Sequence, residues 1–421
     1  MQRGNVKKGL GKGDDATKRH ADRQHAAHRE KRALLIDAIR HKNTPSDTSK
    51  FAHALTLYRA GQGDPVQLLY EMSCSGTDDE IETLLDNVNI IALCNAKTKI
   101  AHDCLCNFLH ARTIHRHALV DTLIKCKVIT TLEMAANAAI AGSSACNDIM
   151  AHTDLISSGA LIQGLQDGDK HAYVFTCAVY ELSTSPPPPW FITTTMPHLI
   201  RNAFDPDKGL YAMGAIAGLS HHIPLPIPLD FVGALCRQLP TLTTAFGHQK
   251  RALHIVVAMV GTQGSNNLDE SVRNALMPHL AEWLRTDVLF FECCSFIEIL
   301  CLRHQHHVRA FAPLFPILVQ CEAVTCIVIA CTASINAQDT QMVQTFMQQY
   351  NAVGACCFLL EKTQDIQVLE RSLVLLYRLH LIAPGEVRSK ISNKTRIMEL
   401  GGHNYARVAD AAERLITALQ H

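Results

Sequence analysis

Histidine and cysteine are the residues of this 421-residue chain best suited to chemistry, because imidazoles and thiolates bind metals and act as nucleophiles. The histidines gather at His221-His222 and at His304, His306 and His307, and such groups could chelate a metal. Among 23 histidines, however, groups of this size arise by chance, and no paired C-x₂-C unit or C-x₂-C with H-x₃-H is present. We therefore expect no metal site and no cofactor.

The 16 cysteines are scattered through segments of helical character, such as Cys104 with Cys106 and the neighbours Cys293-Cys294. A secreted disulfide-bonded scaffold would be shorter and richer in loops. The sequence therefore predicts free thiols that pack as small hydrophobic groups. It contains no Gly-rich phosphate loop, nucleophile elbow or paired-carboxylate motif, so we predict that the protein is not an enzyme.

Composition favours an ordered body made of helices. Hydrophobic residues make up 48% of the chain and charged residues only 19%, unlike a disordered protein. Aromatic residues reach just 6%, fewer than an all-β body would use. No apolar stretch approaches the roughly 20 residues of a membrane span, and residues 1–8 lack the apolar core of a secretory signal. We expect no membrane contact and a location in the cytoplasm and nucleus.

Charge divides the chain near residue 50. Residues 1–50 hold 13 Lys and Arg against 6 Asp and Glu, a net charge of +7, while the whole chain is neutral. Residues 51–421 therefore carry a net charge of −7. An asymmetry of this kind predicts a basic arm with its own partner, attached to a mildly acidic body.

An apolar helix rich in small residues, followed by a polar turn, recurs along the body. Its copies lie at residues 103–107, 135–139, 180–184, 214–218, 254–258, 294–298, 326–330 and 373–377. From Leu105 to Leu375 the mean step is about 39 residues, close to the period of HEAT and armadillo repeats. Because each repeat buries its apolar faces only against its neighbours, we predict one all-α solenoid over residues 51–421.

A second type of helix lies between these copies and starts with a small residue or a proline. Examples begin at Gly159, Met196-Pro197, Met277-Pro278 and Ala352. Since proline fits the first turn of a helix, we expect Pro197 and Pro278 to mark helix starts. Trp283 follows the second of these prolines, and we expect it to pack between repeats.

Three segments of the chain carry a family resemblance. The first runs from Lys7-Lys8-Gly9-Leu10-Gly11-Lys12-Gly13-Asp14 to Arg40-His41-Lys42-Asn43, the second is Tyr180-Glu181-Leu182-Ser183 with the prolines at 186–189, and the third runs from Arg396-Ile397 to Leu415-Ile416. They resemble the importin-β-binding segment, a W-x-L-S-N helix with its Pro-rich turn, and the last repeat of importin-α, the armadillo-repeat adaptor of nuclear import. The resemblance implies a right-handed superhelical solenoid of about 8–9 armadillo repeats behind a flexible basic arm, residues 1–50.

The resemblance implies that this arm binds importin-β. A polar segment of this length does not hold a stable helix alone, so we expect it to fold on binding against an acidic surface. The cationic side chains expected to make the contact are Lys18, Arg19, Arg23, Arg29, Lys31, Arg32, Arg40 and Lys42. The arm could instead be a solvated tail or a nonspecific nucleic-acid arm, but it lacks the interleaved aromatic residues of specific RNA recognition. The resemblance also implies that the cluster at Arg40-His41-Lys42 folds back into the cargo groove when importin-β is absent.

In importin-α the inner helices carry Trp and Asn four residues apart, and these side chains hold the Lys and Arg residues of a cargo peptide. A spacing of four places both side chains on one helix face. This sequence keeps little of that pattern, because two of the inner helices have Gly214 with Gly218 and Cys294 with Glu298 at these positions. We therefore expect a basic cargo peptide or protein to be held in a non-classical way. The candidate groove residues are Asp103, Asn107, Tyr180, Glu181, Thr184 and Glu298. They could equally be ordinary polar groups on a solvated face.

The sequence thus predicts a nuclear import adaptor that works by binding alone. Two alternatives stay open. The protein could be a decoy or regulator that occupies importin-β without carrying classical cargo. It could also be a scaffold of the β-catenin type, in which case residues 1–50 would not bind importin-β.

Overall fold

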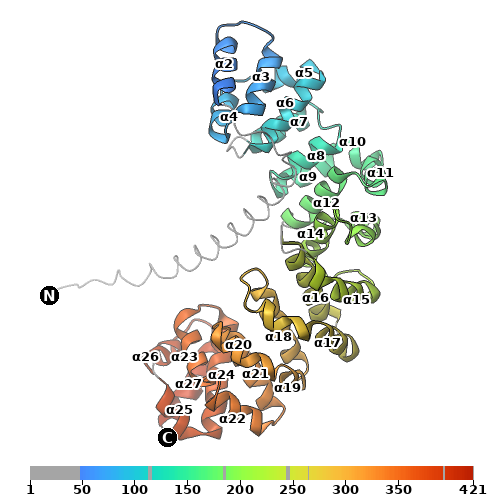
Figure 1. Ribbon diagram of the computed structural model, residues 1–421. Coiled ribbons are helices and arrows are strands. Elements are labelled where there is room, and N and C mark those ends of the chain that lie inside the picture. Colours follow the sequence, from blue (N-terminus) through green and yellow to red (C-terminus); the bar gives the residue numbers. More distant parts are fainter. Residues whose placement is uncertain are drawn as a thin grey trace, which may run out of the picture. The chain divides into compact units, whose positions relative to one another are not determined.

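The computed structural model describes residues 48–111, 116–183, 186–242, 247–263, 265–391 and 394–420. All regular structure within these residues is helical, without a strand, which confirms the all-α prediction (Figure 1). Close contacts divide the chain into two compact units, of which unit 1 ends at Ile227 and unit 2 begins at Pro228. The expected boundary between arm and body, at residue 50, falls at the start of the described part.

Unit 1 is a stack of helices. They are α2 (Thr48–Arg59), α3 (Pro65–Ser75), α4 (Asp78–Leu85), α5 (Ile90–Ala96), α6 (Lys99–His110), α7 (Arg116–Lys125), α8 (Leu132–Ala139), α9 (Ser143–His152), α10 (Asp154–Ser157), α11 (Ala160–Asp167), α12 (Lys170–Leu182), α13 (Pro189–Asn202) and α14 (Gly209–Leu219). An inner row of α3, α6, α8, α12 and α14 runs through the unit, and each helix of the row packs against the next. The other helices, such as α11 and α13, pack alongside this row.

Unit 2 repeats the arrangement. Its helices are α15 (Leu229–Gln238), η1 (Leu239–Thr241), α16 (His248–Gln263), α17 (Asn266–Trp283), α18 (Phe290–Arg303), α19 (His307–Ala310), η3 (Ala312–Leu314), α20 (Phe315–Gln320), α21 (Val324–Asn336), α22 (Thr340–Gln348), α23 (Ala352–Lys362), α24 (Ile366–Ile382), α25 (Pro384–Lys390), α26 (Lys394–Gly401) and α27 (Ala406–Gln420). Its inner row consists of α16, α18, α21, α24 and α27, again with each helix packed on the next. The repeated apolar segments of the sequence fall on the inner helices from α6 to α24, so each unit has the solenoid architecture expected from them.

Several helices begin at a side chain that caps their first turn. Thr77 and Glu80 form a reciprocal capping box at α4, in which the Thr77 backbone N–H donates to Glu80 Oε2 at 2.8 Å. Ser265 Oγ accepts from the Leu268 N–H and starts α17 twelve residues before Pro278. Pro278 and Pro197 therefore lie inside α17 and α13, and the expectation that they mark helix starts is wrong. The proline in the first turn of α13 is Pro189.

The cysteines and Trp283 belong to the core. All 16 cysteines are free, and 13 of them are buried, as the pattern of small hydrophobic positions predicts. Burial raises the pKa of the Cys146 thiol to about 12, so this sulfur stays protonated and unreactive near neutral pH. Trp283 is 5% exposed, and its ring stacks on His279 with 5.4 Å between the ring centroids. In the described part of the chain, no helix combines the length and the apolar character needed to cross a membrane.

Candidate functional site

Asp103 and Asn107 lie one turn apart on α6, and both are partly buried. The Asn107 side-chain nitrogen donates hydrogen bonds to Ser73 Oγ at 3.1 Å and to Cys74 Sγ at 3.2 Å. Both acceptors belong to α3, so the Asn107 amide connects two adjacent inner helices. Because its donors are already used in this way, Asn107 has less to offer to a bound peptide than the Trp/Asn pattern assumes. The binding role of Asp103 stays a prediction.

Tyr180 faces an outer helix and not an open surface. Its ring is fully buried and packs edge-on against Phe191 of α13, with 5.6 Å between the ring centroids. Its hydroxyl shares a hydrogen bond of 2.7 Å with Thr195 Oγ1 of the same helix. Burial raises the pKa of the Tyr180 phenol far above its ordinary value, so the hydroxyl keeps its proton. The structure therefore corrects the interpretation of Tyr180 as a groove residue.

Glu181, the next residue, is also almost buried, with 6% of its surface exposed. Gly218 of α14 lies directly against it, because a Cβ atom at Gly218 would come within 2.9 Å of the Glu181 Cα and backbone N. From Ala172 to Leu182 every residue of α12 is buried. The inner helices α12 and α14 are thus packed too closely for a bulky side chain at position 218, one of the positions that aligned with the Trp/Asn pattern.

Glu298 of α18 contacts the next inner helix of unit 2, α21. It is partly buried, and its Oε1 accepts a hydrogen bond from Cys326 Sγ of α21 at 3.4 Å. Burial raises the pKa of the Glu298 carboxyl, while the Cys326 hydrogen bond and the charge of Arg371 on α24 act in the opposite direction. The carboxylate therefore has an electrostatic partner on the helix two places further along the row.

The exposed face of α18 carries residues that were not among the groove residues predicted from the sequence. Phe291 is 70% exposed and Leu302 is 50% exposed, and Ser295 between them is exposed as well. These positions follow one another at intervals of four and seven residues, so they share one helix face. Cys294 and Glu298 stand at the Trp and Asn positions of this helix, but Cys294 is only 9% exposed, and the exposed pair Phe291 and Ser295 lies three residues earlier. The spacing of four between Phe291 and Ser295 is the signal that could have found them.

A similar exposed stripe runs along α24. Arg371, Val374 and Leu381 are exposed, and Arg378 on the same face donates a hydrogen bond of 2.5 Å to Asn336 Oδ1 of α21. The stripes on α18 and α24 are electrostatically connected, because the charge of Arg371 acts on Glu298. We call the side chains of these two stripes the unit 2 inner face; all are exposed except the half-buried Arg378, namely Phe291, Ser295, Leu302, Arg371, Val374, Arg378 and Leu381.

Other predicted binding residues lie outside the described part of the chain. Thr184 of the expected groove is one of them. The others are the cationic residues of the arm, Lys18, Arg19, Arg23, Arg29, Lys31, Arg32, Arg40 and Lys42. Their contacts with importin-β stay predictions.

The histidines of the α18–α19 turn pair with acidic and basic side chains of α17. His304 Nε2 lies 3.0 Å from an Oδ atom of the fully buried Asp269, and His306 Nε2 lies 3.3 Å from Glu270 Oε1. His307 Nδ1 is 2.8 Å from an Arg273 guanidinium nitrogen. In the described residues no group of three or more His, Cys, Asp or Glu side chains is arranged to hold a metal ion. These imidazoles serve as links between α17 and the turn.

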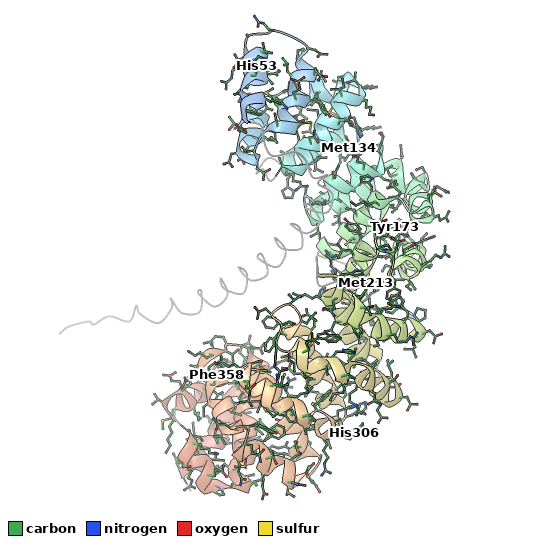
Figure 2. All side chains as sticks on the ribbon, in the orientation of Figure 1. His53, Met134, Tyr173, Met213, His306 and Phe358 are labelled. Atoms are coloured by element: carbon green, nitrogen blue, oxygen red, sulfur yellow. The ribbon has the colours of Figure 1, made fainter. Side chains whose placement is uncertain are left out.

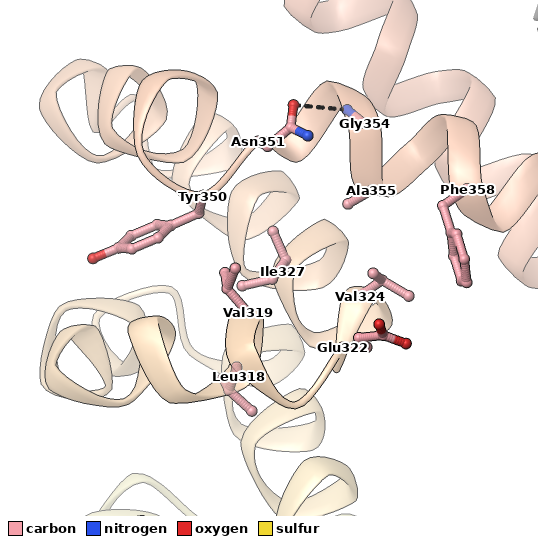
Figure 3. Close-up of a pocket in the computed structure, with 10 residues that line it drawn as sticks. All are labelled: Leu318, Val319, Glu322, Val324, Ile327, Tyr350, Asn351, Gly354, Ala355 and Phe358. Atoms are coloured by element: carbon pink, nitrogen blue, oxygen red, sulfur yellow. Dashed lines mark hydrogen bonds between the residues drawn. The ribbon is translucent and has the colours of Figure 1, made fainter. Parts of the chain in front are cut away.

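A small apolar pocket lies elsewhere in unit 2, between α20, α21 and α23 (Figure 3). It has a volume of about 280 Å³ and is lined by Leu318, Val319, Glu322, Val324, Ile327, Tyr350, Asn351, Gly354, Ala355 and Phe358. Figure 2 places Phe358 and His306 on different sides of unit 2. No residue of α18 or α24 lines the pocket, so it is separate from the unit 2 inner face.

Comparisons with known proteins give a distant structural likeness. No family model matches the chain, and no curated protein matches it significantly. One similar solved structure is described as "A conserved phosphorylation switch controls the interaction between cadherin and beta-catenin in vitro and in vivo". The two chains are 14% identical, the match covers 94% of this chain and 96% of the other, and the TM-score is 0.49. A match at this level assigns neither a family nor a partner.

Proposed function

We propose that the protein is a binding scaffold of the armadillo type, which holds segments of partner proteins on its inner helices and catalyses no reaction. The observation that supports this best is the unit 2 inner face, where Phe291 and Leu302 present large apolar side chains to solvent. Exposed aromatic and aliphatic side chains on one rigid helix can anchor a partner by burying apolar surface. The neighbouring Arg371 and Glu298 add charges of both signs, which can orient a polar backbone or charged side chains.

In its more specific form, the proposal is an import adaptor of the importin-α type that moves between cytoplasm and nucleus. The arm binds importin-β through its basic residues, and the body carries a cargo protein. The support comes from the +7 charge of residues 1–50 and from the order of the three family-like segments. Glu298 and Asp103 supply carboxylates for a basic cargo, and Phe291 supplies an aromatic face for the stem of a Lys or Arg side chain.

The test is an assembly assay with three purified components: the full chain, importin-β and a fluorescent Lys/Arg-rich nuclear localisation peptide. Reversing the charges of Arg29, Lys31 and Arg32 should abolish importin-β binding, which should also weaken as salt rises. The double variant F291A/L302A should weaken peptide binding at least tenfold, because buried apolar anchors dominate such interfaces. L229A is the matched control, since Leu229 is 54% exposed on α15, outside the inner row, and its loss should change neither interaction.

The outcomes separate the alternatives. Binding of importin-β without any peptide affinity would point to the decoy or regulator. Peptide affinity that is lost in F291A/L302A, without importin-β binding, would point to a scaffold of the β-catenin type. If neither F291A/L302A nor the charge-reversal variant changes any interaction, the proposed function is refuted.

A further inference from the structure

The pocket between α20, α21 and α23 is small and has an apolar floor. Its volume of about 280 Å³ is smaller than typical small-molecule sites, which start near 300 Å³. Leu318 and Ile327 are buried at its base, whereas Val319 and Phe358 are 41% and 42% exposed at its rim. Exposed apolar side chains around a hollow are typical of a surface that receives a partner's anchor residue.

The sequence explains why the hollow exists. The α23 helix begins with small residues, and Gly354 and Ala355 face the pocket (Figure 3). A Cβ atom at Gly354 would come within 2.2 Å of the amide nitrogen of Asn351, which caps the helix, so a larger residue there would force the Asn351 side chain to move. The Asn351 Oδ1 accepts a hydrogen bond from the Gly354 N–H at 3.2 Å. Glycine at 354 therefore leaves room for this position of the cap, and the small residues at 354 and 355 leave the space empty.

Glu322 gives the rim a negative charge. This residue is exposed in the turn after α20, with a left-handed φ of 55°. Its backbone closes the turn, because the Glu322 N–H donates to the Val319 carbonyl and the Ala323 N–H donates to the Leu318 carbonyl. The carboxylate has no hydrogen bond or ion pair with the described residues of the chain. The apolar hollow thus has one uncompensated carboxylate at its mouth.

We propose that this pocket docks a segment of a partner protein that inserts one Leu or Phe side chain and places a Lys or Arg next to Glu322. The apolar side chain covers the exposed parts of Val319 and Phe358, and the cation compensates the Glu322 carboxylate. This is a second docking point, distinct from the unit 2 inner face. The partner would need a Leu or Phe close to a Lys or Arg, and this requirement goes beyond the proposed function.

The backbone of Glu322 permits a clean test. A left-handed residue at the end of a helix is most stable as glycine, so E322G removes the carboxylate while leaving the protein at least as stable. Gln338 is the matched control, because it also has a φ of 55° and closes the turn after α21 through the same pattern of backbone hydrogen bonds. Q338G should therefore have the same effect on stability and none on docking.

The experiment uses the full chain with labelled methyl groups and two 15-residue peptides. Each peptide carries one Phe, and they differ only in having Lys or Glu four residues after it. We expect the Lys peptide to shift the methyl signals of Val319, Val324 and Ile327 in a saturable way. E322G should weaken this binding about two- to fivefold, as for an exposed ion pair, and should remove the preference for Lys over Glu. A355L should fill the pocket and abolish the shifts.

Other outcomes would overturn the proposal. It fails if the Lys and Glu peptides bind the parent chain equally well, if Q338G weakens binding as much as E322G, or if the pocket methyls do not respond. Shifts that depend on protein concentration without peptide would mean that a second copy fills the pocket. Shifts on deletion of residues 1–47 would mean that the arm fills it. Each result is independent of F291A/L302A, so failure here is distinguishable from failure of the proposed function.

Discussion

Gly218 shows at the level of one residue why α14 cannot carry a bulky side chain at this position of the Trp/Asn pattern of importin-α. The position aligns with that pattern, yet the Glu181 backbone occupies the space that any side chain would need. Glycine at this point allows α14 to approach α12 closely. A glycine at this position allows tight packing between the two helices, but it leaves no side chain there to bind a peptide.

The substitution G218A should destabilise the protein. The added Cβ would lie 2.9 Å from the Glu181 Cα, and backbone cannot rotate away as a side chain can. We expect a loss of about 1–2 kcal/mol in the free energy of unfolding, since overpacking outweighs the gain in helix propensity. G261A is the matched control: Gly261 also lies in an inner helix, but its added Cβ would be an ordinary 3.6 Å from Ile299 Cδ1. Urea unfolding followed by circular dichroism should show G261A equal to or more stable than the parent.

At the level of the helix, the sequence predicted which segments are inner helices but not which side of each helix is exposed. The small-residue segments were found because they are apolar over a whole turn or more. For the same reason they lack the alternation of apolar and polar residues that identifies an exposed face. In α12, where Ala172 to Leu182 are all buried, the pattern could not show that Tyr180 faces α13. In α18 it could not distinguish the exposed Phe291 from the buried Phe296.

The contact between α17 and α19 should make stability depend on pH. The His307 ring is fully buried, and burial, with the charges of His306, Arg273 and His304, lowers the pKa of His307 to about 4. An unfolded histidine titrates near pH 6.5. Between about pH 4 and pH 6.5 the unfolded chain therefore binds more protons at this residue, so the free energy of unfolding falls as the pH falls.

The contribution of His307 to this loss should be at most about 3 kcal/mol, complete near pH 4. It can be isolated with H307Q, which should be less sensitive to pH over that range than the parent chain. H53Q is the control, because His53 is exposed on α2 and its replacement should leave the pH dependence unchanged. Urea midpoints measured at intervals from pH 4 to pH 7.5 provide the comparison. Equal slopes for H307Q and the parent would contradict the assignment to His307.

At the level of the whole molecule, the chain is made of local contacts. Each inner helix packs on its neighbours in the row, and no long-range sheet joins distant parts of the described chain. Stability in such an array is the sum of repeat and interface contributions, and cooperativity can be confined to a part of it. This is also why the period of about 39 residues was enough to predict the fold class, whereas the division after Ile227 was not visible in the sequence.

The two units should therefore unfold in separate steps, and the chain contains a reporter for each. Trp190 lies in unit 1, and Trp283 is buried in unit 2 against His279. In a W190F background, fluorescence reports on unit 2 alone, and in a W283F background it reports on unit 1. G218A should lower the urea midpoint seen by Trp190 and leave the midpoint seen by Trp283 unchanged. A single transition, shifted equally for both reporters, would show that the whole solenoid unfolds as one cooperative body.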